Sequence, residues 1–107
     1  HHIPHEIHGQ TLAEIRRVLR PGAPLMIYEH NPINPLTVRA VRTCPLDENA
    51  VLIGGSEMQR RCMVQGFRKT RLEYRVFFPA ALKRLRPLES HLRWLGLGAQ
   101  YAVHAIA

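Results

Sequence analysis

The first third of the chain carries a helical pattern of hydrophobic positions. Its apolar stripe repeats every fourth residue, which is the spacing of one helix face. The residues of this stripe are Ile7, Thr11, Ile15 and Leu19. The pattern predicts a helix over residues 5–19, with Pro4 at the first helical position. A capping box formed by Thr11 and Glu14 leaves open a shorter helix that begins at Thr11.

A turn and a short apolar run follow this helix. Pro21 and Gly22 are the residue types that a type II turn requires at its two central positions. Residues 25–28 are apolar without interruption, which predicts a strand covered on both faces, as in the middle of a parallel sheet. The strand ends in three polar residues, Glu29, His30 and Asn31. Ligands of open α/β sheets bind beyond the carboxyl ends of strands, so we expect functional chemistry there.

The middle of the chain reads as two helices joined by a polar connection. After a loop rich in proline and asparagine, residues 36–42 are predicted to form a short helix and residues 43–49 a connection. Ser56 and Gln59 make a second capping box, which predicts a helix over residues 57–65.

Past this helix the spacing changes to period two. Gly66 is predicted to end the helix in a left-handed conformation, with Phe67 closing the motif through a hydrophobic contact. Residues 70–78 alternate between apolar and charged side chains, which predicts a strand with one covered face and one wetter face at a sheet edge. A last strand is predicted over residues 99–106.

Residues 80–95 form a basic amphipathic segment that Pro87 interrupts. Basic residues lie between its leucines, which are Leu82, Leu85, Leu88, Leu92 and Leu95. Three interpretations remain open: a surface helix packed on the sheet, a substrate lid, or a peripheral membrane contact through the stretch from Leu82 to Leu95.

The order of these elements resembles the second half of a class I S-adenosylmethionine-dependent methyltransferase. The residues that carry the resemblance are Glu-Ile-Arg-Arg-Val-Leu-Arg-Pro-Gly at 14–22, the apolar strand, and Glu-His-Asn-Pro at 29–32. The family usually has a second glycine where this chain has Ala23. The resemblance implies an α/β fold: the C-terminal half of a Rossmann-like seven-stranded sheet, with strands five, six and seven and their flanking helices. In that family the seventh strand lies antiparallel between the fifth and the sixth.

The resemblance also implies what residues 1–107 lack. The family binds S-adenosyl-L-methionine mainly through a glycine-rich loop and an acidic residue in its first half, and this chain has no Gly-x-Gly-x-Gly. The whole chain is therefore interpreted as the C-terminal part of one methyltransferase domain, inactive on its own. The complete enzyme is expected to methylate a small-molecule, lipid or sugar acceptor.

Candidate site residues follow the family's fourth and fifth strands. His2 and His30 are the candidate catalytic residues, because histidine can exchange a proton near neutral pH. His1 and His2 are the candidates for contact with the cofactor, and the candidate substrate-binding residues are His1, Asn31, Asn34 and Asp47. The alternative is that these residues cap loops and make structural hydrogen bonds. A metal site among His1, His2, His5 and His8, of which His5 and His8 would share a helix face, is considered and not predicted.

Composition changes this interpretation little. The formal net charge of +7 comes mainly from arginine and allows a second function, a small basic module that binds nucleic acid or an anionic surface. The arginines are scattered and lack interleaved aromatic residues, so nucleic acid is an unlikely partner. Cys44 and Cys62 form no Cys-x-x-Cys pattern, which favours a reducing compartment, and we expect a cytoplasmic protein. Neither the composition nor the order of elements indicates the oligomeric state.

Overall fold

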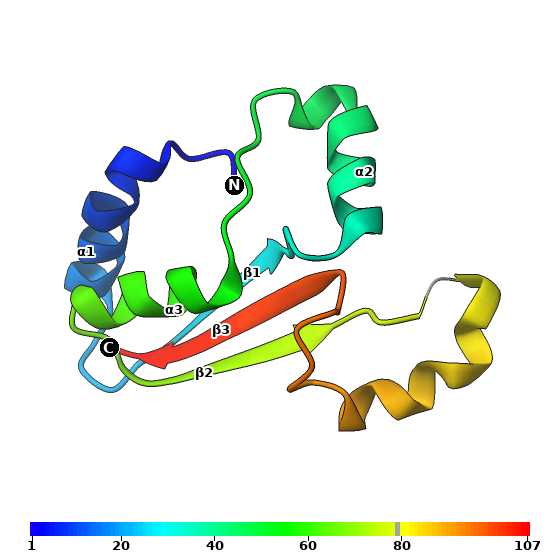
Figure 1. Cartoon of the computed structure of the whole chain (residues 1–107). Coiled ribbons are helices and arrows are strands. Elements are labelled where there is room, and N and C mark those ends of the chain that lie inside the picture. The colour runs from blue at the N-terminus through cyan, green and yellow to red at the C-terminus, as the bar shows by residue number, and fades with distance from the viewer. Residues whose placement is uncertain (79) are drawn as a thin grey trace.

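One antiparallel sheet lies at the centre of the computed structural model, which describes residues 1–78 and 80–107 (Figure 1). Its strands are β1 (Pro24–His30), β2 (Arg68–Arg75) and β3 (Gln100–Ile106). The strand order within the described residues is β1-β3-β2, and β3 pairs antiparallel with both neighbours. The last strand of the chain therefore lies between the two earlier ones, as predicted.

The sheet carries one helical layer, formed by α1 (His8–Val18) and α3 (Gly55–Val64). Helix α3 contacts β2, β3 and α1 and lies across the sheet in Figure 1. Strand β3 is paired on both edges and covered by α3, so it is shielded from water. Its apolar side chains therefore form the centre of the hydrophobic core. The buried residues of this core are Leu12, Ile53, Met58, Cys62, Phe67, Tyr74, Tyr101, Val103, Ala105 and Ala107.

The remaining elements lie away from this core. Helix α2 (Pro35–Thr43) and the short 3₁₀ helix η2 (Pro45–Asp47) follow the end of β1, while η1 (His5–Ile7) precedes α1. A longer 3₁₀ segment, η3 (Ala80–His91), connects β2 toward β3 and projects to one side (Figure 1). Among the residues that the structure describes, no helix is both long enough and apolar enough to cross a membrane.

The turn predicted before β1 is confirmed, but the predicted burial of the strand is not. Gly22 has a φ of +83°, and the N–H of Ala23 donates to the carbonyl of Arg20 at 2.9 Å, as a type II turn requires. On β1, Met26 and Tyr28 are 51% and 52% exposed. The prediction of a strand covered on both faces is therefore wrong, because the described helices cover only one face of the sheet.

The two ends of α3 differ in how well the sequence predicted them. The predicted capping box is wrong: Gly54 is the N-cap without a side-chain bond, and Gln59 instead donates to Thr70 on β2 at 3.1 Å. The C-terminal prediction is confirmed. Gly66 has a φ of +86°, and the N–H of Phe67 donates to the carbonyl of Cys62 at 3.1 Å, which completes a Schellman motif.

The first helix is shorter than predicted. Residues His5–Ile7 form the 3₁₀ turn η1 and the α-helix begins at His8, while Pro4 precedes η1 as its N-cap. A helical segment therefore begins at His5, as predicted, although its first turn is 3₁₀, and the alternative start at Thr11 is wrong. The short helix predicted over residues 36–42 is confirmed as α2.

The second half of the chain departs from its predictions at β2 and η3. Strand β2 ends at Arg75, and Val76 adopts a φ of +59°. On the face predicted to be wet, Glu73 is buried, at 7% exposed. Segment η3 is 3₁₀ rather than α-helical, with a break at Leu82, and none of its residues is buried. A surface helix packed on the sheet is therefore not what this segment forms.

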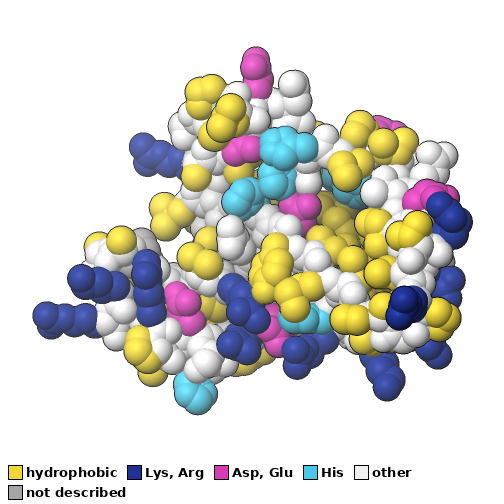
Figure 2. All heavy atoms as spheres, turned by 180° about the vertical axis from the view of Figure 1, so that it is seen from behind, with side chains coloured by type: hydrophobic (Ala, Val, Ile, Leu, Met, Phe, Trp, Pro, Cys, Tyr) yellow, Lys and Arg dark blue, Asp and Glu magenta, His cyan; other side chains and the backbone are white. Residues whose placement is uncertain are grey.

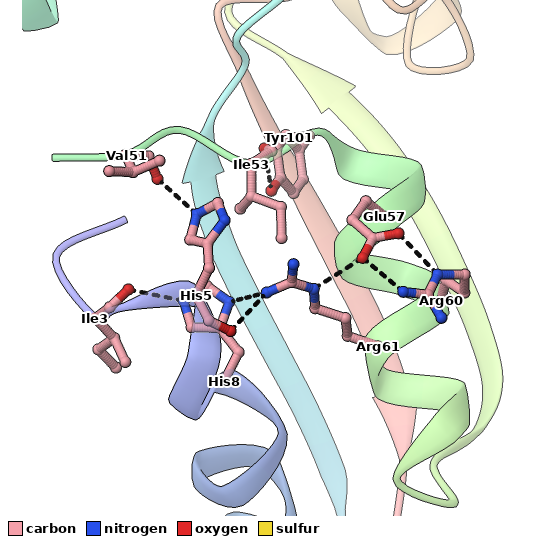
Figure 3. A network of polar contacts seen from close by, with 9 residues as sticks. All are labelled: Ile3, His5, His8, Val51, Ile53, Glu57, Arg60, Arg61 and Tyr101. Carbon is pink, nitrogen blue, oxygen red and sulfur yellow. Dashed lines mark hydrogen bonds and ion pairs between the residues drawn. The ribbon is translucent and has the colours of Figure 1, made fainter.

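A polar network joins α1 to α3 (Figure 3). The ring of His8 lies between the carbonyl of Ile3, at 2.9 Å, and the guanidinium of Arg61, at 2.8 Å. Arg61 and Arg60 both donate to Glu57, and these hydrogen bonds lower the pKa of Glu57 to about 2. The network orders the segment before α1 and sets how the two helices meet.

Candidate functional site

A cluster of histidine and acidic side chains lies where β1 ends. The backbone nitrogen of His1 donates to one carboxylate oxygen of Glu29 at 2.9 Å, and its ring Nδ1 donates to the other. The carbonyl of His1 accepts from the N–H of Val51 at 3.0 Å. These contacts hold the start of the chain between the end of β1 and the segment before α3.

Asp47, at the end of η2, faces the same cluster. His2 Nε2 lies 3.2 Å from Asp47 Oδ1, and His1 Nε2 lies 3.8 Å from the same oxygen. The side chains of His1 and Asp47 are each 17% exposed, whereas that of His2 is 56% exposed. The cluster is thus shielded on its inner side and open to solvent beside His2.

His30 completes the cluster from the last position of β1. Its ring centroid lies 4.9 Å from that of His1, whose ring in turn lies 4.3 Å from that of His2. Figure 2 shows histidine side chains beside acidic ones near the middle of one face of the molecule. The fold therefore gathers four of the predicted site residues, which are His1, His2, His30 and Asp47.

A mainly apolar cavity adjoins the cluster. It has a volume of about 460 Å³ and lies between α2 and the ends of β2 and β3. His30 and Asp47 line it at the cluster, and its apolar lining includes Leu36, Val41 and Phe77. A small apolar molecule could enter this cavity with a polar group facing the histidines.

Asn31 and Asn34 lie close by but have structural partners. Asn31 is fully buried, and its amide donates to the carbonyls of Gly96 and Gly98 at 2.9 and 2.7 Å. Asn34 caps α2 by accepting from two backbone N–H groups, and it donates to the carbonyl of Leu97 at 2.8 Å. The two amides bind the loop before β3 to the end of β1 and to the start of α2. Their role in substrate binding stays a prediction.

Sequence reasoning missed Glu29 as a site residue. Its carboxylate fixes His1, and it was noted in the sequence only as one of three polar residues that end the strand. The signal available was its position, because it directly precedes His30 at the carboxyl end of a strand. No residue near it in sequence indicates that the distant His1 is its partner.

The comparisons with known proteins bear on the fold. No protein-family model matches the chain, and no curated protein is significantly similar to it in sequence. Among solved structures, the chain is similar to a SAM-dependent methyltransferase from Archaeoglobus fulgidus, with a TM-score of 0.70 and 13% sequence identity. The match covers 99% of this chain and 54% of that one, so this chain spans about half the length of the solved protein. The likeness shows a methyltransferase-like α/β fold, and at this identity it shows the fold alone.

Proposed function

We propose that residues 1–107 are the C-terminal part of a class I SAM-dependent methyltransferase domain. Under this proposal β1, β2 and β3 are strands five, six and seven of a seven-stranded Rossmann-like sheet. The observation that carries the proposal is the position of β3, antiparallel between β1 and β2, in a chain that matches a solved methyltransferase over 99% of its length. The preceding half of the domain would supply the glycine-rich loop that holds most of the S-adenosyl-L-methionine.

The histidine cluster is proposed to lie at the methyl-transfer site. The sulfonium of S-adenosyl-L-methionine is already activated, so the protein mainly aligns the acceptor atom with the methyl group. His2 and His30 are the proposed catalytic residues, of which one would take a proton from the acceptor. His1 and His2 would also contact the methyl end of the cofactor, by analogy with the family.

The cavity supports an acceptor that is a small molecule or a lipid-linked molecule with an apolar part. Its mainly apolar lining favours burial of hydrocarbon, while His30 and Asp47 offer polar partners at one end. Asn31, Asn34 and His1 complete the proposed substrate-binding set.

A cofactor-binding experiment tests the function directly. The full-length gene product that contains residues 1–107 should bind S-adenosyl-L-methionine in calorimetry. Failure of that protein to bind the cofactor would overturn the proposal.

Replacement of the proposed base gives the first prediction about activity. With an acceptor identified by transfer of labelled methyl groups, His30→Gln should lower kcat by about 10²–10⁴-fold, because a general base contributes about that much. The affinity for cofactor should change little. The exposed residue His91, on η3, provides the matched control His91→Gln, which should keep full activity. Equal activity of the two variants would remove His30 from the catalytic set.

We also propose that η3 contacts an anionic membrane surface. Leu82, Leu85 and Leu88 are 47%, 40% and 52% exposed, and they alternate with basic residues at positions 83, 84 and 86. Figure 2 shows basic and hydrophobic side chains gathered on the lobe that projects to one side. Exposed leucines beside positive charges complement the apolar and anionic layers of a membrane surface, and such a contact would bring a lipid-linked acceptor to the cavity.

The alternative of a basic nucleic-acid module has less support. Several arginines are paired within the chain, since Arg60 and Arg61 bind Glu57 while Arg71 and Arg75 bind Glu73. The charge of these four arginines is therefore partly neutralised, which weakens their attraction for phosphate.

A cytoplasmic location is part of the proposal. Cys44 and Cys62 are both free thiols, and Cys62 is fully buried. Unpaired cysteines fit a reducing compartment such as the cytoplasm, where S-adenosyl-L-methionine would be present.

A further inference from the structure

We propose that His1, His2 and Asp47 bind a divalent transition-metal ion, best matched by Zn²⁺, beside the cavity. One ligand atom from each of these three residues lies within 4.8 Å of the other two. Two imidazoles and one carboxylate are ligands that zinc accepts. Of the four histidines considered from the sequence, the site retains His1 and His2, and Asp47 takes the place of His5 and His8.

The distances in the cluster are close to those of a metal site. Zinc bonds to nitrogen and oxygen are about 2.0–2.2 Å long, so two ligand atoms of a tetrahedral site lie roughly 3.3–3.5 Å apart. Asp47 Oδ1 lies 3.2 Å from His2 Nε2 and 3.8 Å from His1 Nε2. The ligand atoms of His1 and His2 lie within 4.8 Å of each other, so side-chain rotation would have to draw the two rings closer together around an ion.

Glu29 supplies the outer partner that metal-binding histidines usually have. A carboxylate oxygen only accepts hydrogen bonds, so the contact with Glu29 places the proton of a neutral His1 ring on Nδ1. The lone pair then lies on Nε2, the atom that faces Asp47. A carboxylate that orients a histidine in this way recurs in zinc sites, where it fixes the ring and raises its basicity.

The other histidine pair lacks this arrangement. Both ring nitrogens of His8 are occupied, by the carbonyl of Ile3 and by Arg61, and the Nε2 of His5 contacts the carbonyl of Val51. A positive guanidinium 2.8 Å from His8 opposes a cation there. The metal inference therefore applies to the cluster at the end of β1 alone.

Three protein ligands leave the fourth tetrahedral position open, which is the arrangement of catalytic rather than structural zinc sites. Of the three ligands, Asp47 also lines the cavity, so an ion at this site would lie next to the space proposed for the acceptor. A hydroxyl group of an acceptor bound to the ion would lose its proton more readily. With His2 bound to the ion, His30 alone remains as the proposed base. This role of the ion rests on the proposed function, whereas the binding of the ion does not.

A titration of Zn²⁺ into the chelator-treated full-length gene product tests the inference. Calorimetry should give one ion per chain. Asp47→Asn and His2→Gln should each weaken the affinity by at least about 10-fold, and Glu29→Gln by about 10–100-fold, as measured for outer-shell carboxylates. Substitution by Co²⁺ should give the visible absorption of a tetrahedral site.

Matched controls separate ligand loss from general damage. Glu48→Gln removes an exposed carboxylate next to Asp47, and His91→Gln removes an exposed histidine, so both should keep wild-type affinity. His2 is 56% exposed, so His2→Gln should fold even if Asp47→Asn does not. Absence of stoichiometric zinc, or equal affinities of His2→Gln and His91→Gln, would overturn the inference. Because zinc is titrated without cofactor, protein that binds S-adenosyl-L-methionine but no zinc refutes this inference and leaves the proposed function standing.

Discussion

His8 is a buried histidine whose neighbours disfavour its protonated form. Burial lowers the pKa of His8 below its ordinary value of 6.5, and the charge of Arg61 lowers it further, against the effect of the hydrogen bond to Ile3. In the unfolded chain the ring returns to the ordinary pKa and binds a proton more readily. His8 therefore contributes stability that is fully present above pH 6.5 and is lost as the pH falls toward the lower folded pKa.

The resulting prediction concerns the pH dependence of folding. The free energy of unfolding, measured in denaturant between about pH 8 and about pH 5, should fall as the solution becomes acidic. His8→Gln should be less stable at pH 8 but should show a flatter pH profile. His91→Gln, which changes an exposed ring, should retain the wild-type slope. A His8→Gln profile as steep as that of the wild type would show that His8 is not the titrating group.

The site residues show what sequence can indicate about single side chains. The position of His30 after a predicted strand was sufficient to place it at the edge of a cavity. The same reasoning could not predict that the amide of Asn31 donates to the carbonyls of Gly96 and Gly98, because these partners lie 65 and 67 residues away in sequence. Residue type tells which bonds a side chain can make, and only the tertiary fold decides which it does make.

At the scale of elements, local signals were sufficient where the backbone itself carried them. The turn at Gly22 and the end of α3 at Gly66 both depend on a positive φ that glycine adopts without strain. The capping box predicted at Ser56 does not form, because the side chain of Gln59 donates to Thr70 on β2 instead. Strand β1 was predicted to be covered on both faces, since an apolar run alone cannot tell whether a second layer is present in the chain.

The basic residues of η3 should determine how tightly the protein binds an anionic membrane. A basic residue near an anionic membrane surface contributes about 1 kcal/mol, so three of them contribute about 3 kcal/mol. The combined replacement Lys83→Gln, Arg84→Gln and Arg86→Gln should thus weaken binding of the full-length gene product to phosphatidylglycerol vesicles by about 100-fold. Binding to uncharged phosphatidylcholine vesicles should be weak for both proteins.

The control for this experiment removes the same charge elsewhere. Arg16, Arg17 and Arg20 are exposed on the far end of α1 and its following turn. Replacing these three by glutamine should leave vesicle binding within a few-fold of wild type. An equal loss in both triple variants would mean that net charge, and not η3, determines the affinity.

The whole molecule has a sheet with an open edge. Strand β1 pairs with β3 on one side, and within residues 1–78 and 80–107 no strand pairs with its other side. The order of strands followed from the resemblance to a known family and not from hydrophobic periodicity, because periodicity says nothing of which strands are neighbours. The methyltransferase-like fold was thus predictable, and so were His1, His2, His30 and Asp47 as candidate site residues. The contacts of Glu29 with His1 and of Asp47 with His2 emerged only in three dimensions.

This open edge predicts the behaviour of residues 1–107 expressed alone. An unpaired strand edge is a template for pairing with another chain, and the half-exposed side chains of Met26 and Tyr28 add apolar surface beside it. Under the proposed function the preceding half of the domain covers both. The isolated 107 residues should therefore self-associate in sedimentation velocity as their concentration rises, whereas the full-length gene product should not do so through β1. Met26→Lys places a charge on the strand and should shift the isolated chain toward monomer.

Val18→Lys is the matched control, because it adds the same charge at an exposed apolar position of α1, outside the sheet. It should leave self-association unchanged if β1 is the surface responsible. An isolated chain that stays monomeric at every concentration would mean that the edge and the exposed face of β1 need no cover. That result would count against a domain completed by further strands, and so would an equal effect of the two lysines. A selective effect of Met26→Lys would locate the missing contact at β1, the strand whose end carries His30 and the cluster beside it.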